Sequence, residues 1–103
     1  MKTQMFESIV ETIKAVPFGR VATYGQIARW AGFPGHSRQV ARTLHSSSKK
    51  YDLPWHRIIN SQGKISLPEP GYSRQMELLK DEGISFSDAG KVFLEEFGME
   101  NSE

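Results

Sequence analysis

The chain has 103 residues, of which 38% are hydrophobic and 24% charged, a composition typical of one soluble globular domain. It contains no cysteine, which excludes disulfides, thiolate metal sites and thiol nucleophiles. No apolar run is long enough to span a bilayer, and Glu7 and Glu11 argue against a signal peptide at the start. We therefore expect one domain over residues 1–103, with an ordered core of about 3–97, in the cytoplasm.

Charge is unevenly distributed along the chain. Residues 20–57 hold seven basic residues and one acidic residue, a net charge of +6, whereas residues 58–103 hold four basic and nine acidic residues, a net charge of −5. This split predicts one face that meets a polyanion, although a solvated surface with a chance distribution of charge would give the same numbers. The three histidines lack the spacing of a helical metal motif, so we expect no metal and no other cofactor.

Hydrophobic periodicity predicts two helices in the first third of the chain. Apolar residues recur at helical spacing over residues 4–15, and a proline and a glycine follow. After a short extended piece at 21–22, Thr23 stands three residues before Gln26, which is a capping-box pattern. The helix that Thr23 opens is expected to run to about Ala31.

A third helix follows a glycine-containing turn at 32–35. Ser37 can cap this helix, which we expect at about 37–46. Two short helices joined by such a turn form the helix-turn-helix pattern. At about 100° per residue, Val40 and Leu44 lie opposite a cationic face, which comprises Arg38, Arg42 and His45. This division indicates a DNA-recognition helix, and a plain amphipathic core helix would show it too.

The second half of the chain is expected to complete a mainly α, winged helix-turn-helix-like domain with a small β-hairpin. A Ser-Gln-Gly turn signal predicts a hairpin or wing over residues 57–66. Ser73 can cap a fourth helix over about 73–82, which a glycine ends. Residues 84–93 are predicted to pair as a second short hairpin, and the acidic last ten residues are expected to fray.

The chemistry of the chain centres on Trp55 and His56. A tryptophan that follows proline in a basic loop is either a core aromatic or a wall for a nucleic-acid base. His56 alone is ambiguous, since a lone histidine is usually structural. Glu82 leans toward the apolar side of the fourth helix, where a carboxylate needs a partner such as a histidine or a backbone amide.

The segment Pro54-Trp55-His56-Arg57-Ile58 resembles the Pro-Cys-His-Arg-Val signature of the O6-alkylguanine-DNA alkyltransferases. Trp55 stands where the reactive cysteine of these enzymes would be, and that replacement is typical of alkyltransferase-like proteins. Further stretches resemble the family in order and at consistent spacing, and together they cover most of residues 4–87: they are 19–28, 31–34, 37–40 and 78–83. Two positions depart from the pattern, because Ser47 replaces a hinge asparagine and Pro68 replaces an arginine found in some alkyltransferase-like proteins.

The resemblance implies a role for each matching residue. Tyr24 corresponds to the tyrosine that rotates the target nucleotide outward, and Arg38 to the arginine that fills the vacated place in the base stack. Extrusion of a base costs about a few kcal/mol, and a planar guanidinium suits the second role. DNA contacts are expected from Tyr24, Ser37, Arg38, Gln39 and Arg42, and a lesion pocket from Tyr24, Trp55, His56 and Arg57. His56 and Glu82 match the pair that activates the cysteine and would be a structural remnant.

The resemblance implies a non-enzymatic damage sensor. Its partners would be duplex DNA containing O6-alkylguanine and nucleotide excision repair proteins, and we expect a nucleoid-associated monomer. Two alternatives stay open. A helix-turn-helix transcription regulator would need dimer symmetry, for which the sequence shows no dimerisation helix. An enzyme with another chemistry could use His56 and Glu82 as an acid–base pair, but a lyase or glycosylase would want a lysine or aspartate near the pocket.

Overall fold

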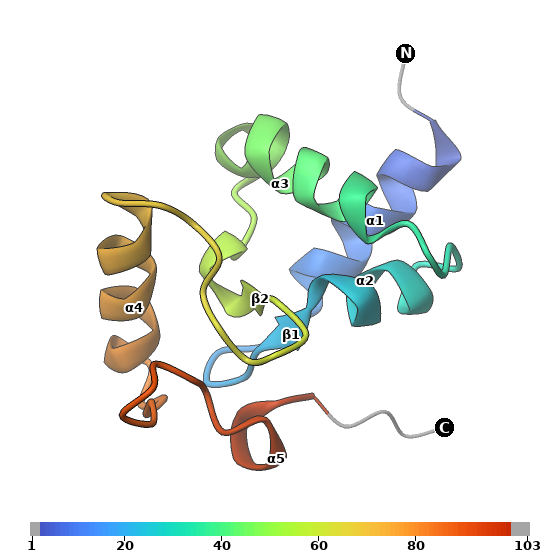
Figure 1. Ribbon diagram of the computed structural model, residues 1–103. Helices are drawn as coiled ribbons and strands as arrows, with labels where there is room; N and C mark the ends of the chain where they lie inside the picture. Colours follow the sequence, from blue (N-terminus) through green and yellow to red (C-terminus); the bar gives the residue numbers. More distant parts are fainter. Residues whose placement is uncertain (1–2, 100–103) are drawn as a thin grey trace.

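Three helices from the first half of the chain pack together, and a fourth lies apart from them across two short strands (Figure 1). The computed structural model describes residues 3–99. In chain order the elements are α1 (Gln4–Lys14), β1 (Ala22–Thr23), α2 (Tyr24–Trp30), α3 (Ser37–Tyr51), the 3-10 turn η1 (Trp55–Arg57), β2 (Ile58–Ile59), α4 (Gly71–Asp81) and α5 (Leu94–Phe97). The prediction of a mainly helical fold is confirmed. None of the described helices is long and apolar enough to cross a membrane.

The first two helices begin where local capping chemistry predicts. Thr3 accepts a hydrogen bond from the Phe6 amide at 3.0 Å at the start of α1. At α2 the capping box is complete, because the Thr23 hydroxyl accepts from the Gln26 amide and the Gln26 side chain accepts from the Thr23 amide. The box fixes Tyr24 as the first residue of α2.

α3 is longer than the sequence predicts, since it ends at Tyr51 and not at about residue 46. Its buried side chains Val40, Thr43 and Ser47 keep the helical period through the serine-rich segment. Tyr51 then packs its ring edge-on against Phe6 of α1, with centroids 5.7 Å apart. The predicted cap is also displaced by one position, because His36 is the capping residue and makes no side-chain capping bond. Tertiary packing therefore extends the helix beyond its local signals.

The two strands separate two apolar clusters. Ala22 pairs with Ile58 and Thr23 with Ile59 in a parallel register. Ala22 and Ile58 belong to the cluster beneath α1, α2 and α3, whereas Ile59 joins the cluster that contains Leu79 of α4. Successive side chains of a strand point to opposite faces, which explains this division.

The hairpin predicted over 57–66 is wrong, because β2 pairs in parallel with β1. The predicted turn does form. The side-chain oxygen Oδ1 of Asn60 accepts hydrogen bonds from the backbone amides of Gln62 and Lys64, each at 2.9 Å. The hairpin predicted over 84–93 is confirmed, since Phe86 pairs antiparallel with Val92 around a tight turn. The two predicted hairpins differ because the strand at 58–59 pairs with a strand far away in the sequence, whereas residues 86 and 92 pair with each other.

The start of α4 and the end of the described chain also differ from expectation. α4 begins at Gly71, and the Glu69 carboxylate, rather than a Ser73 cap, accepts the Ser73 amide at 3.1 Å. The segment through Met99 is hydrogen-bonded to Val21, the residue before β1, because Val21 donates to the Phe97 carbonyl and accepts from the Met99 amide. The prediction of a frayed tail is therefore wrong through residue 99, and residues 100–103 lie outside the described chain.

Candidate nucleic-acid interface

α3 presents an exposed cationic side. Ser37, Arg38 and Arg42 are exposed and Gln39 is half-buried, while Val40 on the other side is fully buried. Within residues 3–99, the side chains of Arg38 and Arg42 make no hydrogen bond and no ion pair. Uncompensated guanidinium groups on one helix favour contact with an anion such as a phosphate.

A cavity of about 720 Å³ opens between α3 and α4. Its volume falls within the range of about 300–1,000 Å³ typical of small-molecule sites. Trp55 and Tyr24 contribute aromatic surface, and Gln75 contributes the polar group that is most deeply buried. The remaining lining residues come from α3, two loops and β2: Ala41, Leu44, His45, Ser48, Lys49, Asp52, Leu53, Ser66, Leu67 and Ile58.

Trp55 is held in the cavity wall by the short turn η1. The turn begins after Pro54 and runs directly into β2, so the buried strand anchors the backbone that carries the indole. The Trp55 ring meets the His56 ring edge-on, with centroids 6.0 Å apart and planes at 81°. Trp55 is half-buried, which leaves part of the indole available to a ligand.

Tyr24 reaches the cavity from the N-terminus of α2. Its hydroxyl lies 3.2 Å from the Ser66 hydroxyl, so the phenol is tied to the loop that forms the facing wall. Tyr24 and Trp55 are therefore the two predicted pocket residues that the structure brings into one cavity.

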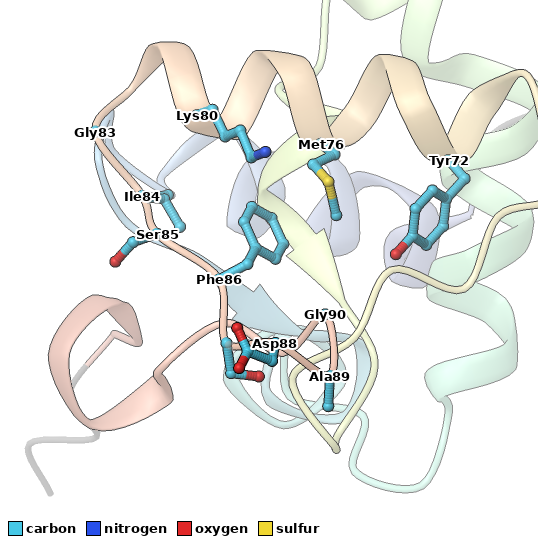
Figure 2. Close-up of a pocket in the computed structure, with 11 residues that line it drawn as sticks. Tyr72, Met76, Lys80, Gly83, Ile84, Ser85, Phe86, Asp88, Ala89 and Gly90 are labelled. Atoms are coloured by element: carbon cyan, nitrogen blue, oxygen red, sulfur yellow. The ribbon is translucent and has the colours of Figure 1, made fainter.

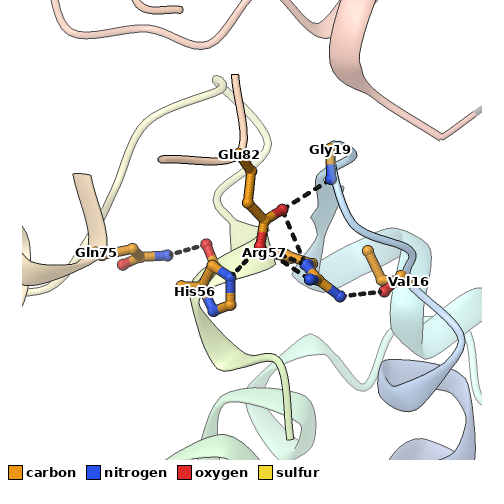
Figure 3. A network of polar contacts seen from close by, with 6 residues as sticks. All are labelled: Val16, Gly19, His56, Arg57, Gln75 and Glu82. Atoms are coloured by element: carbon orange, nitrogen blue, oxygen red, sulfur yellow. Dashed lines mark hydrogen bonds and ion pairs between the residues drawn. The ribbon is translucent and has the colours of Figure 1, made fainter. Parts of the chain in front are cut away.

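His56 and Arg57 take part in a separate polar network that is centred on Glu82 (Figure 3). His56 Nε2 lies 2.6 Å from Glu82 Oε2, and the Gly19 amide donates to Glu82 Oε1 at 2.8 Å. Arg57 Nη1 also donates to the Val16 carbonyl at 2.9 Å. Neither His56 nor Arg57 lines the cavity, so the structure does not bring these two predicted pocket residues to it.

The electrostatics of Glu82 follow from these contacts. Burial alone would raise the pKa of the Glu82 carboxyl, but its hydrogen bonds from Arg57, Gly19 and His56, together with the Arg57 charge, outweigh that effect and hold the pKa below its ordinary value. The carboxylate is thus stabilised in its charged form. Among residues 3–99, no group of three or more acidic, histidine or cysteine side chains could hold a metal ion.

Gln75 is a site residue that the sequence patterns did not reveal. It lies on the buried face of α4, is 2% exposed, and donates to the carbonyls of His56 and Ile58, each at 3.0 Å. Its position four residues before Leu79 and seven before Glu82 was the available signal. Polar residues on the apolar face of a helix require partners, and here the partner is the backbone that carries Trp55.

Two other cavities contain none of the predicted lesion-pocket residues, which are Tyr24, Trp55, His56 and Arg57. A hollow of about 710 Å³ lies between α4 and the loop at 83–90, and none of the predicted residues lines it (Figure 2). A cleft of about 540 Å³ between α1 and α3 is lined in part by Gln39 and Arg42. The cavity at Trp55 is therefore the candidate site.

Comparison with known proteins places the chain in a family. Residues 4–84 match the family described as the 6-O-methylguanine DNA methyltransferase, DNA binding domain. A DNA base-flipping protein of Vibrio parahaemolyticus is 44% identical over 94 residues, covering 91% of this chain and 94% of that protein. Alkyltransferase-like protein 1 of Schizosaccharomyces pombe is 36% identical over 83 residues, which are 79% of this chain and 77% of the relative.

Solved structures agree with the sequence relatives. The S. pombe protein Atl1, crystallised with damaged DNA containing O6-carboxymethylguanine, superposes with a TM-score of 0.82 at 32% identity and covers 97% of this chain and 99% of its own. The Mycobacterium tuberculosis alkyltransferase in complex with DNA has a TM-score of 0.68 at 27% identity, over 80% of this chain and 51% of that enzyme. The chain therefore belongs to the 6-O-methylguanine DNA methyltransferase DNA-binding family, among its alkyltransferase-like members.

Proposed function

We propose that this protein is a non-enzymatic sensor of DNA damage that binds O6-alkylguanine in duplex DNA by nucleotide flipping. The observation that carries the proposal is the cavity of about 720 Å³ with Trp55 in its wall, next to the helix that carries Arg38 and Arg42. A relative of known structure is bound to DNA with an O6-alkylated guanine, which supports the same ligand here. Phosphate contacts from α3 would supply affinity, and the cavity would supply lesion preference.

Flipping requires one group to turn the nucleotide and another to replace it. Tyr24, which lines the cavity, has the bulk to rotate the phosphate and sugar. Arg38 is exposed near the start of α3, and the family resemblance implies that it enters the duplex from the minor groove. O6-alkylation removes the N1 proton of guanine and weakens its pairing with cytosine, so the damaged base is less costly to extrude. Arg38 would then stack in the gap and donate to the unpaired cytosine.

The absence of catalysis follows from the chemistry of the acceptor position. Trp55 stands where the family signature has its reactive cysteine, and the chain contains no cysteine. An indole is not a usable nucleophile under these conditions. The His56–Glu82 hydrogen bond of 2.6 Å therefore has no thiol to activate, and it acts as a structural link.

A protein that binds the lesion without repairing it can act only through others. We propose that it works as a nucleoid-associated monomer in the cytoplasm, shields the lesion from alkyltransferase and marks it for nucleotide excision repair. A helix-turn-helix regulator without lesion preference is the alternative that the experiment must exclude.

Binding to matched duplexes tests the proposal. Duplexes with guanine or with methyl-labelled O6-methylguanine at one position should show tighter binding of the damaged form, and the label should stay on the DNA. Trp55→Ala should reduce this preference by roughly 1–3 kcal/mol, as other base–aromatic contacts do, with a smaller effect on undamaged DNA. Trp30→Ala is the matched control, because Trp30 does not line the cavity.

Two results would contradict the proposal. Transfer of the label to the protein, or its release as methanol, would show an enzyme. Equal affinity of the wild-type protein for both duplexes would instead favour a regulator that does not recognise damage.

A further inference from the structure

In the side-chain amide of Gln75, the nitrogen Nε2 is hydrogen-bonded within the protein, whereas the oxygen Oε1 accepts no hydrogen bond from the described residues. Nε2 donates to the His56 and Ile58 carbonyls, each at 3.0 Å, and this uses both of its hydrogens. The orientation of the amide is therefore settled, because the flipped form would set Oε1 against two carbonyl oxygens. Oε1 makes no hydrogen bond with any of residues 3–99.

Gln75 Oε1 keeps a small solvent-accessible surface. No fully buried side-chain nitrogen or oxygen in the described chain lacks a hydrogen-bond partner, so the 2% of Gln75 that is exposed includes Oε1. Gln75 lines the cavity that contains Trp55 and Tyr24. The cavity wall thus includes one hydrogen-bond acceptor in a fixed orientation, Oε1 of Gln75, and the rest of this side chain is buried.

The chemistry of the ligand selects the partner of this acceptor. Alkylation at O6 removes the N1 proton of guanine, and N3 and N7 are acceptors, so the 2-amino group is the one donor left on the base. We propose that Gln75 Oε1 accepts a hydrogen bond from the 2-amino group of the extruded base and makes the pocket specific for purines that carry this group. The inference rests on the proposed function, since it requires the base to enter this cavity.

A purely structural role for Gln75 predicts a different result. In that case the amide serves only to hold the turn that carries Trp55, and any side chain that donates to the two carbonyls would replace it. A lysine offers such donors and no acceptor. Gln75→Lys therefore separates the two roles, and Gln75→Arg does so with a longer side chain.

The test uses three duplexes that differ in one base opposite cytosine: guanine, O6-methylguanine, and 6-methoxypurine, which is O6-methylguanine without its 2-amino group. We expect the wild-type protein to bind O6-methylguanine about tenfold more tightly than 6-methoxypurine, the effect of one buried hydrogen bond. Gln75→Lys should lose this ratio and retain binding to undamaged DNA. The cost of extruding each base from the DNA is the same for the wild-type protein and for Gln75→Lys. A change in the ratio of the two affinities therefore measures the contribution of Gln75.

The control for the added charge is Gln62→Lys on an exposed turn, which should leave the ratio unchanged. A lysine or arginine variant that keeps the wild-type ratio would overturn the inference, and so would a wild-type protein that binds both modified bases equally. In both of these cases the proposed function stands if the modified duplexes are bound more tightly than guanine. Failure to prefer O6-methylguanine over guanine would overturn the proposed function itself.

Discussion

Arg57 donates hydrogen bonds to both carboxylate oxygens of Glu82. Arg57 Nε lies 3.1 Å from Oε1 and 3.0 Å from Oε2, and Nη2 lies 2.9 Å from Oε2. Through this pair and the bonds to Val16 and Gly19, the turn after Trp55, the loop before β1 and the end of α4 are held together. The pair therefore helps to fix the turn whose Trp55 side chain lines the cavity.

Glu82→Gln should destabilise the fold. The substitution leaves the Arg57 guanidinium largely buried without its counter-charge, for which a loss of about 3 kcal/mol in the free energy of unfolding is expected. Glu77→Gln is the control. Glu77 forms an ion pair with Arg74, and their side chains are 64% and 60% exposed. Such an exposed pair should contribute less than about 1 kcal/mol to the free energy of unfolding. Urea denaturation of both variants measures the difference, and equal losses would contradict the structural role of the pair.

The Glu82 contribution should depend on pH in a defined direction. The folded protein holds the pKa of Glu82 below its ordinary value of 4.5, so the stabilisation is fully present above that value. It is lost as the pH falls through the lower, folded-state pKa, where the carboxylate takes up a proton. The difference in unfolding free energy between wild type and Glu82→Gln should be constant near neutral pH and narrow below 4.5. If this difference in unfolding free energy grew as the pH fell, the pKa of Glu82 would be raised in the folded protein and not lowered.

Arg42→Glu should weaken binding to all duplexes by about the same factor. Arg42 is exposed on α3, so it is expected to contact phosphate, and its loss should reduce the slope of log K against log salt by about 1. The same reversal at exposed Lys91, in the acidic half of the chain, should have little effect. Salt titration with undamaged and damaged duplexes measures both variants. A loss confined to the damaged duplex would place Arg42 at the lesion instead.

Arg38→Ala should impair extrusion more than docking. Removal of the guanidinium leaves a gap in the base stack and an unpaired cytosine, whereas undamaged DNA loses one phosphate-scale contact. A fluorescent base analogue at the lesion site should brighten with wild-type protein and much less with Arg38→Ala. Arg29→Ala, at an exposed arginine of α2, is the matched control. Equal brightening with all three proteins would show that Arg38 is only another charge facing the DNA.

The sequence predicts best where the determinant is local. The capping box at Thr23 and Gln26 involves four consecutive residues, and the structure reproduces it in full. The parallel pairing of Ile58 with Ala22 joins residues that are far apart in the chain, so a turn signal at 61–63 favoured the wrong partner for that strand. The last turn of α3 likewise depends on Phe6, which no pattern within α3 reveals.

The candidate site shows the same distinction. The family signature indicated Trp55, the matching stretch at 19–28 indicated Tyr24, and both residues line the cavity. The same signature grouped His56 and Arg57 with the pocket, although adjacent residues in a tight turn point in different directions and these two contact Glu82. Gln75 was missed because its role depends on which carbonyls lie opposite α4 after folding.

The division of the apolar interior at β2 limits how this protein can change over evolution. Ile58 and Ile59 are neighbours in the chain, yet each fills a different cluster, and the three residues before them form the turn that carries Trp55. A change of side-chain volume at either position would shift the backbone of that turn, because packed interiors transmit strain. Mutations that alter which ligands bind and mutations that alter thermal stability therefore fall in the same short segment of the chain. Selection for one property here is expected to constrain the other.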